Sequence, residues 1–338
     1  MEQPWIDKPK TDVVFILAPA FFMVSLVFLF QDALQYVEEY FSFYTWLFLI
    51  VFIDVAHVYA TLFKTYFVPE AFQKRRRLLI FLPILCFVIG MILFSFGSLI
   101  FWSVLAYVAV FHFIRQLYGF MRLYSRKEVK TKWSTFYDAL VIYTATGYPM
   151  FYWFFSTPRA FIWFTPHDFV KLKHQGILSI LGWVYILILS SYLIFTVYTY
   201  VKDQYFNIPK NAIISGTFLS WYFGIVYFNN DLVFTLLNVV SHGIPYMALI
   251  YLYDIQKNTT NPYRFLGYLR GSRGLLLFVA FVLLIAFCEE YFWEILVWND
   301  QFAVSSYDFS SWQFILVPLL TVPQFTHYLL DGFIWKSK

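Results

Sequence analysis

Long uncharged runs recur along this chain, and they constrain its fold more than any other feature. Of the 338 residues, 61% are hydrophobic and 13% are charged, whereas soluble domains average about 45 to 50% apolar and about 25% charged residues. Each run is close to the roughly 20 residues that a helix needs to cross about 30 Å of hydrocarbon. Because the runs are continuous and do not alternate, they favour helices over barrel strands. We therefore predict an all-α polytopic membrane bundle.

The runs predict about ten transmembrane helices in a single integral membrane domain over residues 1–338. The first run is too long for a signal peptide and has no small-residue cleavage site, so we interpret it as a retained span. The absence of a targeting extension favours a bacterial inner (cytoplasmic) membrane. The expected spans are roughly 13–31, 41–67, 78–96, 98–121, 135–155, 175–200, 211–228, 231–253, 273–296 and 311–335.

Basic residues fix the expected orientation, because they gather at alternate connections between the spans. By the positive-inside rule these connections, and both termini, are cytoplasmic. We expect the basic loops to bind anionic lipid headgroups, and we expect no nucleic acid, since each cluster adjoins a span and no soluble module follows it. The clusters are Lys74 to Arg77; Arg122, Arg126, Lys127, Lys130 and Lys132; Lys202 and Lys210; Lys257, Arg264, Arg270 and Arg273; Lys336 and Lys338. Only one outer connection, with Arg159, Lys171 and Lys173, departs from the rule.

Four of the six histidines lie inside predicted spans: His57, His112, His242 and His327. Their spans are the second, fourth, eighth and tenth, which all run from outside to inside. Each histidine lies 11 to 16 residues from the predicted outer end of its span, which is roughly 17 to 24 Å deep at about 1.5 Å per residue. Ionisable groups inside a membrane are costly and mark functional sites. Four imidazoles in one layer predict a shared metal or cofactor site, with separate hydrogen-bonding histidines as the alternative.

Hydrogen-bonding side chains accompany these histidines on the same helix faces. Asp54 precedes His57 by three residues, and a polar residue follows each histidine by four: Thr61, Gln116, Tyr246 and Asp331. Metal-bound imidazoles usually donate their second N–H to such a partner. Arg115 is expected to be a buried cation that pairs with Asp331 or Asp54, or that holds an anionic group. We thus predict supporting or catalytic roles for Asp54, Arg115, Gln116, Tyr246 and Asp331, against a packing network as the alternative.

Neutral imidazoles suit iron, copper, zinc or nickel, and no thiolate is near. A site with iron would leave coordination positions open for dioxygen and would act on an apolar substrate that enters from the lipid. A site with zinc on three histidines would activate water, with Asp54 or Asp331 as general base. The membrane desaturases and hydroxylases, with their closely spaced histidine clusters, are excluded, since no two histidines here are closer than seven residues.

The stretch SHGIPYMAL (Ser241–Leu249) is similar to the HGA-type motif of the membrane-embedded Brp/Blh retinal-forming carotene dioxygenases. Those enzymes are polytopic and hold one iron on four helix-borne histidines. The resemblance covers this stretch and the architecture, and it implies a ligand role for His242 alone. The chain lacks that family's paired-histidine segment and has more expected spans. More broadly it resembles uncharacterised bacterial polytopic membrane proteins.

The leading hypothesis is a membrane-bound, metal-dependent oxidoreductase: a non-haem iron oxygenase of a lipid or isoprenoid. Its alternatives are a zinc-dependent intramembrane lipid hydrolase, a bis-histidine haem electron carrier, and a proton or metal transporter. Transport draws its support from Glu289 and Glu290 in the ninth span, which an interfacial location would also explain. No protein partner is predicted.

Overall fold

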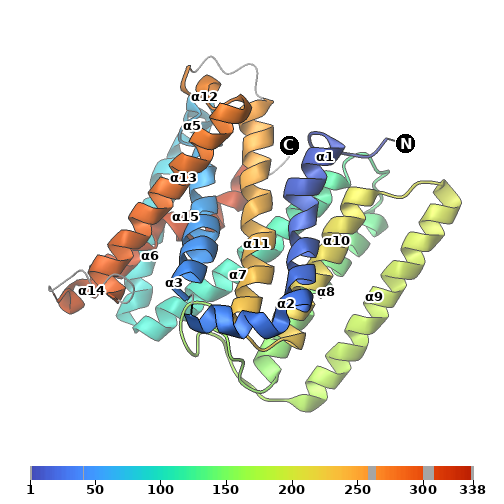
Figure 1. Ribbon diagram of the computed structural model, residues 1–338, viewed down its shortest axis with the longest axis horizontal. Coiled ribbons are helices and arrows are strands. Elements are labelled where there is room, and N and C mark those ends of the chain that lie inside the picture. The colour runs from blue at the N-terminus through green and yellow to red at the C-terminus, as the bar shows by residue number, and fades with distance from the viewer. Residues whose placement is uncertain (1, 41, 258–263, 300–307, 336–338) are drawn as a thin grey trace. The chain divides into compact units, whose positions relative to one another are not determined.

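Continuous apolar sequence gives helices throughout the part of the chain that the structure describes. The computed structural model describes residues 2–40, 42–257, 264–299 and 308–335, and within these ranges every regular element is helical (Figure 1). The predicted all-α polytopic fold is confirmed. Residue 41, where the second predicted span begins, and the basic residues Lys336 and Lys338 lie outside the described residues.

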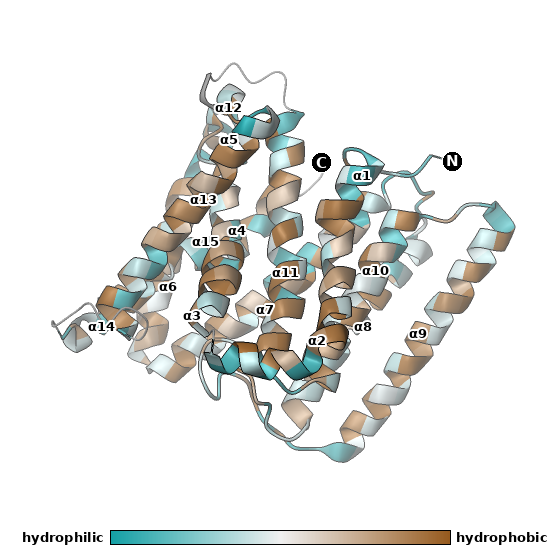
Figure 2. Ribbon diagram, in the orientation of Figure 1, coloured by the Kyte–Doolittle hydropathy of each residue, from teal (hydrophilic) through white to brown (hydrophobic). Residues whose placement is uncertain are grey.

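Seven helices among the described residues are long and apolar enough to cross a membrane. Figure 2 shows hydrophobic residues along their middles and hydrophilic residues at helix ends and connections. The chain is therefore a multi-pass integral membrane protein. These helices are Pro9–Tyr40, Ser42–Phe63, Arg76–Ser95, Ser98–Tyr124, Gln175–Asp203, Asp231–Gln256 and Gly271–Trp298, and they match the first, second, third, fourth, sixth, eighth and ninth predicted spans.

The other three predicted spans are helical but shorter, interrupted or less apolar. They are α8 (Lys132–Phe155), α10 (Ile208–Trp221) with the π-helix η4 (Tyr222–Tyr227), and α14 (Gln313–Leu320) with α15 (Val322–Ile334). A turn at Thr321 separates α14 from α15, and Pro323 follows in the first turn of α15, where a missing N–H is tolerated. Helix α11 (Asp231–Leu249), by contrast, runs uninterrupted through Pro245. The count of ten spans stays a prediction.

The first span begins with α1 (Pro9–Asp12) and η1 (Val13–Leu17) and continues as α2 (Ala18–Tyr40). Within α2, Phe30 has non-helical backbone angles (φ −124°, ψ 20°). The helix therefore turns one residue before the predicted end of the span, where the sequence becomes polar.

Contacts divide the chain into two compact units. Unit 1 comprises residues 1–34 and 113–242, and unit 2 comprises residues 35–112 and 243–338. Helices α7 (Ser98–Tyr124) and α11 contribute residues to both units. Because each unit is compact by itself, the single domain over residues 1–338 stays a prediction.

In unit 1, α8 is the helix on which the others assemble. It packs against α9 (Gln175–Asp203), α10 and η4, and α10 also contacts η1. The connection after α8 folds back on the helix end, since the backbone N–H groups of Leu172 and His174 donate to the carbonyls of Phe154 and Phe155. These bonds satisfy carbonyls that a helix end leaves without partners.

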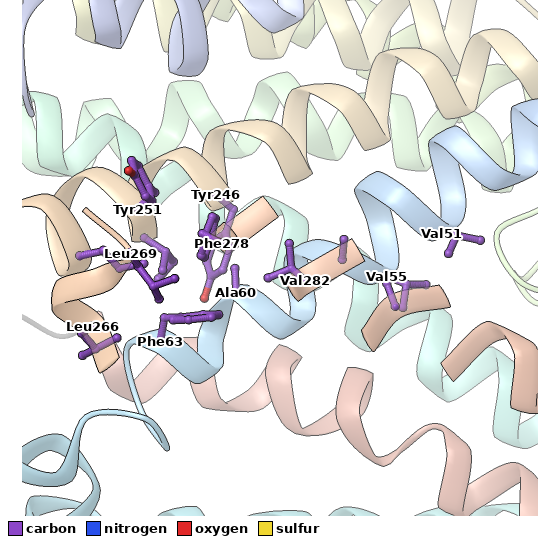
Figure 3. Packing of buried hydrophobic residues seen from close by; sticks show 14 residues of the cluster. Val51, Val55, Ala60, Phe63, Tyr246, Tyr251, Leu266, Leu269, Phe278 and Val282 are labelled. Atoms are coloured by element: carbon purple, nitrogen blue, oxygen red, sulfur yellow. The ribbon is translucent and has the colours of Figure 1, made fainter. Parts of the chain in front are cut away.

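In unit 2, α13 (Gly271–Trp293) packs against η2 (Trp46–Val55) and α4 (Ala56–Ala60), while α15 packs against α4 and α6 (Arg76–Ser95). Figure 3 shows the resulting core, in which Phe63, Phe278 and Val282 pack together with Tyr246.

The second predicted span changes its helix type along its length, from the π-helix η2 to the α-helix α4 and then to the 3₁₀ turn η3 (Thr61–Phe63). π-helical segments are rare and often lie at functional sites. The remaining elements are α3 (Ser42–Thr45), α5 (Pro69–Lys74), η5 (Ile250–Gln256), α12 (Arg264–Tyr268), η6 (Glu294–Trp298) and η7 (Ser310–Trp312).

Candidate metal centre

Two histidines of unit 2 turn the same ring nitrogen toward each other. His112 lies on α7 and His327 on α15, and their Nε2 atoms are 3.1 Å apart. Each side chain is about 2% exposed. Two ring nitrogens in such a buried position face either a shared proton or a shared cation.

Proton counting fixes the tautomer of His327. The Tyr246 hydroxyl donates its only proton to Asp331 Oδ1 at 2.7 Å. The Thr61 hydroxyl lies 2.9 Å from the Tyr246 oxygen and must therefore donate there, because a hydroxyl carries a single donor. His327 Nδ1, at 2.8 Å from Thr61 Oγ1, must then carry a hydrogen and donate it to Thr61. The neutral imidazole of His327 thus presents the Nε2 lone pair to His112.

His112 has its second nitrogen near a carboxylate. Its Nδ1 is 3.8 Å from Asp331 Oδ2, a separation for charge attraction and too long for a hydrogen bond. The contacts therefore form a closed ring through His112, His327, Thr61, Tyr246 and Asp331. This ring draws on three separate stretches of the sequence besides α7: η3, α11 and α15.

His57 lies beside this pair. It sits on α4, about 1% exposed, with its ring centroid 5.0 Å from that of His327 and 6.3 Å from that of His112. Ligand atoms of His57 and His112 lie within 4.8 Å of one another, as do those of His112, His327 and Asp331. Its Nδ1 is 3.7 Å from Asp54 Oδ1. Each of the three histidines therefore has an oxygen near Nδ1.

The donor set and its spacing fit a transition-metal ion. Nitrogens at about 2.0 to 2.1 Å from one ion are roughly 2.9 to 3.4 Å apart for angles between about 90° and 110°, and the two Nε2 atoms fall within this range at 3.1 Å. His327 Nδ1 is within hydrogen-bond distance of an oxygen, as is usual for a metal-bound imidazole, whereas the carboxylate oxygens near Nδ1 of His57 and His112 are 3.7 and 3.8 Å away. Within unit 2, the residues whose ligand atoms all lie within 4.8 Å of one another are His112, His327 and Asp331, and the ring of His57 lies beside that of His327.

The fourth predicted ligand, His242, is the last residue of unit 1. It is buried, and its ring stacks on Phe113 with centroids 3.6 Å apart. Gln116 Nε2 donates to the His242 carbonyl at 2.8 Å, so Gln116 supports the backbone of α11 at this point. A ligand role for His242 beside the histidines of unit 2 stays a prediction.

Arg115 differs from expectation. Its side chain is exposed, Nη1 donates to the Tyr143 hydroxyl at 2.8 Å, and the guanidinium lies 5.1 Å from the Tyr118 ring. The prediction of a buried cation is therefore wrong. The physical reason is the direction of the side chain, which points toward Tyr118 of α7 and Tyr143 of α8, and a tyrosine ring and a hydroxyl suit a guanidinium.

Two polar contacts of unit 2 were not predicted: the partner of Glu289, a residue that the sequence had singled out, and the pair of Lys64 and Asp254. Glu289 on α13 is buried and accepts a hydrogen bond from the Tyr59 hydroxyl, and the neighbouring Glu290 is buried as well. An interfacial location for these glutamates stays a prediction. Lys64 Nζ donates to both carboxylate oxygens of Asp254 at 2.9 and 3.0 Å. A charged residue within an apolar run was the available signal in both cases.

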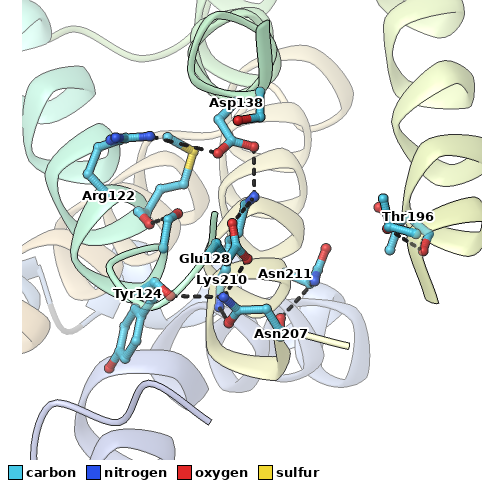
Figure 4. A network of polar contacts seen from close by, with 12 residues as sticks. Arg122, Tyr124, Glu128, Asp138, Thr196, Asn207, Lys210 and Asn211 are labelled. Atoms are coloured by element: carbon cyan, nitrogen blue, oxygen red, sulfur yellow. Dashed lines mark hydrogen bonds and ion pairs between the residues drawn. The ribbon is translucent and has the colours of Figure 1, made fainter. Parts of the chain in front are cut away.

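Unit 1 holds a different polar cluster, which Figure 4 shows. Lys210 Nζ binds Glu128 at 2.9 Å and Asp138 at 2.8 Å, and Asn207 Nδ2 donates to Glu128 at 2.6 Å. Arg122 lies 3.9 Å from the second oxygen of Asp138. Two cations thus face two carboxylates, and Lys210 is a structural ion-pair partner.

The chain was compared with protein families, curated proteins and solved structures. No protein-family model, no curated protein and no solved structure matches the chain. The functional argument therefore rests on the residues of the chain itself.

Proposed function

We propose that this protein is a membrane-embedded, metal-dependent enzyme whose centre is built on His57, His112 and His327, with His242 as the predicted fourth ligand. Within this class we propose a non-haem iron oxygenase acting on a lipid or isoprenoid. Iron on neutral imidazoles supplies dioxygen activation when coordination positions remain open.

One observation carries the proposal: the Nε2 atoms of His112 and His327 are 3.1 Å apart while both Nδ1 atoms face oxygens. A histidine pair of this kind has one of two explanations. Either one ring carries its hydrogen at Nε2 and donates to the other, or both rings present lone pairs to a cation. The hydrogen-bond chain through Thr61 places the hydrogen of His327 on Nδ1, so the Nε2 lone pair of His327 can face either a hydrogen on His112 Nε2 or a cation. The third buried histidine, His57, whose ring centroid is 5.0 Å from that of His327, favours the cation.

The remaining residues of the site have positioning roles. Thr61 holds the ring of His327, Tyr246 holds Thr61 and Asp331, and Asp331 attracts Nδ1 of His112. The core around Tyr246 and Phe63 keeps bulk water out, which strengthens every electrostatic contact inside. An apolar substrate suits such surroundings better than a charged one.

A haem between His112 and His327 does not fit this geometry. Axial nitrogens on opposite sides of one iron would be roughly 4 Å apart, at about 2.0 Å each from the ion, and the observed separation is 3.1 Å. Their ring planes are also inclined by 65° with centroids 4.6 Å apart, which leaves no space for a porphyrin.

Proton or metal transport is a second candidate, and the burial of Glu289 and Glu290 favours it. Carboxylates inside a span mark ion and proton pathways. Uptake of protons or metal ions into vesicles containing the purified protein would distinguish transport from catalysis.

Elemental analysis by plasma mass spectrometry, with an optical spectrum, tests the proposal on detergent-purified protein never exposed to a chelator. Near-stoichiometric iron without a Soret band is the expected result, followed by oxygen consumption on addition of isoprenoid or lipid substrates. Stoichiometric zinc would replace oxygenation by hydrolysis, with Asp331 or Asp54 as base. Absence of any transition metal would overturn the proposal.

A further inference from the structure

Unit 1 has a cavity between α8 and the first half of α9, and none of its lining residues belongs to the histidine site. Its volume is about 370 Å³, within the range of about 300 to 1,000 Å³ that is usual for small-molecule sites. Its polar lining includes Tyr148, Tyr152 and Ser156 from the α8 side and Gln175 and Ser179 from α9.

The lining is polar without being charged. Its hydrogen-bonding groups are hydroxyls and one amide, each able both to donate and to accept, and no Asp, Glu, Lys or Arg lines the cavity. Arg159 lies behind the lining, with its guanidinium 5.3 Å from the Tyr152 ring and its Nη2 donating to the Phe228 carbonyl at 2.7 Å. Such a lining matches a ligand whose polar groups are themselves hydroxyls.

The wall of the cavity is pre-organised. The Tyr148 ring stacks on Tyr185 with centroids 4.5 Å apart, and Tyr185 stacks in turn on Tyr222 at 6.0 Å. Gly182 keeps the space open, because a Cβ at this position would lie 3.3 Å from the Tyr148 hydroxyl oxygen. A larger side chain at position 182 would project into the cavity.

The surface next to the cavity is apolar and exposed. Trp183, which also lines the cavity, is 71% exposed, and Ile180 and Leu187 are 66% and 69% exposed. These residues belong to a helix that is long and apolar enough to span the membrane. Lipid chains are the medium that covers such a face, so a ligand can keep its apolar part on α9 and its polar part in the cavity.

From these observations we infer that the α8–α9 cavity binds a membrane lipid with an uncharged, hydroxyl-rich headgroup. The headgroup lies among Tyr148, Ser179 and Gln175, and the acyl chains run along α9 beside Trp183. This site shares no residue with the proposed metal centre.

Native mass spectrometry of the full chain in detergent tests the inference with two probes: a hexosyl diacylglycerol and a phosphatidylglycerol with the same acyl chains. The hexosyl lipid should bind the unaltered protein more tightly. Gly182→Leu should weaken that binding at least tenfold by filling the cavity. Gly176→Leu is the matched control, because position 176 is on the same helix, does not line the cavity, and has its nearest neighbour at an ordinary 3.5 Å.

Tyr148→Phe is the second variant, and it keeps the stack on Tyr185 should Gly182→Leu not fold. Loss of one hydroxyl contact should weaken binding by roughly two- to tenfold. Unchanged hexosyl-lipid binding in Tyr148→Phe and in folded Gly182→Leu would overturn the site. Tighter binding of phosphatidylglycerol than of the hexosyl lipid would overturn the headgroup assignment.

Discussion

Each of the two units buries a polar network, and the two networks differ in whether their positive and negative charges balance. In unit 1, Lys210 and Arg122 face Asp138 and Glu128, so positive and negative side chains balance (Figure 4). In unit 2, the ring through His112, His327 and Asp331 contains one carboxylate and imidazoles whose nitrogens converge. The charges of the first network balance one another, and the second is where we propose a bound cation.

From this difference we expect the network of unit 1 to stabilise the fold and the network of unit 2 to bind a metal ion. Buried ion pairs are costly to break, because the remaining charge has no partner. Converging lone pairs are costly to assemble unless a proton or a metal lies between them. Substitutions in unit 1 should therefore affect folding, and substitutions in the histidine ring should affect metal binding.

Lys210→Met should have the largest effect on stability. It leaves Asp138 and Glu128 without their shared cation, which costs roughly 3 kcal/mol or more for a buried pair. The measurement is the free energy of unfolding in detergent, with exposed Lys202→Met as control. The metal content per folded protein should not change. Loss of metal from folded Lys210→Met would contradict the claim that the unit 1 network is structural only.

His112→Ala and His327→Ala should each reduce metal affinity more than about 100-fold, beyond the roughly 10- to 100-fold that outer partners of a metal site contribute. The protein should remain inserted. Competition with a chelator of known affinity measures the change, and His167→Asn, at an exposed histidine of the α8–α9 connection, is the control. Full metal occupancy in both alanine variants would exclude this pair as ligands.

Asp331→Asn should reduce metal affinity by roughly 10- to 100-fold, as expected for a residue that acts through the imidazoles. The amide keeps the size of the side chain but removes the negative charge near Nδ1 of His112. The same chelator competition reports the change. Complete loss of metal would instead identify Asp331 as a direct ligand.

Thr61→Val should have the smallest effect, a decrease in metal affinity of roughly two- to tenfold, equivalent to one hydrogen bond of about 0.5 to 1.5 kcal/mol. Valine has nearly the same shape as threonine but lacks the hydroxyl that accepts the hydrogen bond from His327 Nδ1. Thr146→Val is the control, since Thr146 is buried in unit 1 and bonds only to carbonyls of its own helix. Equal losses in both variants would show a general effect of packing.

The sequence predicted the helical fold because hydrocarbon leaves an apolar run no other way to satisfy its backbone. It also predicted that Thr61, Tyr246 and Asp331 accompany the histidines, since one helical turn places residues four apart on the same face. It did not predict the hydrogen-bond partners of these residues. Thr61 follows His57 by four residues, but its hydroxyl contacts His327. Such partners depend on the packing of α4 against α15, which periodicity does not encode.

Arg115 and Glu289 show that the sequence does not predict whether a charged residue of an apolar run is buried or exposed. Both are charged residues within apolar runs, and a rule based on run length treats them alike. The structure exposes Arg115 beside two tyrosines and buries Glu289 against Tyr59. The rotation of a helix about its own axis decides this, and neighbouring helices set that rotation.

The most direct test of the central claim is X-ray absorption spectroscopy at the edge of the bound metal, on the unaltered protein and on His327→Ala. We predict imidazole scattering from at least three histidines in the unaltered protein, and a lower imidazole count with reduced occupancy in the variant. A metal coordinated without imidazole, or an imidazole count that His327→Ala leaves unchanged, would contradict a metal centre built on these histidines.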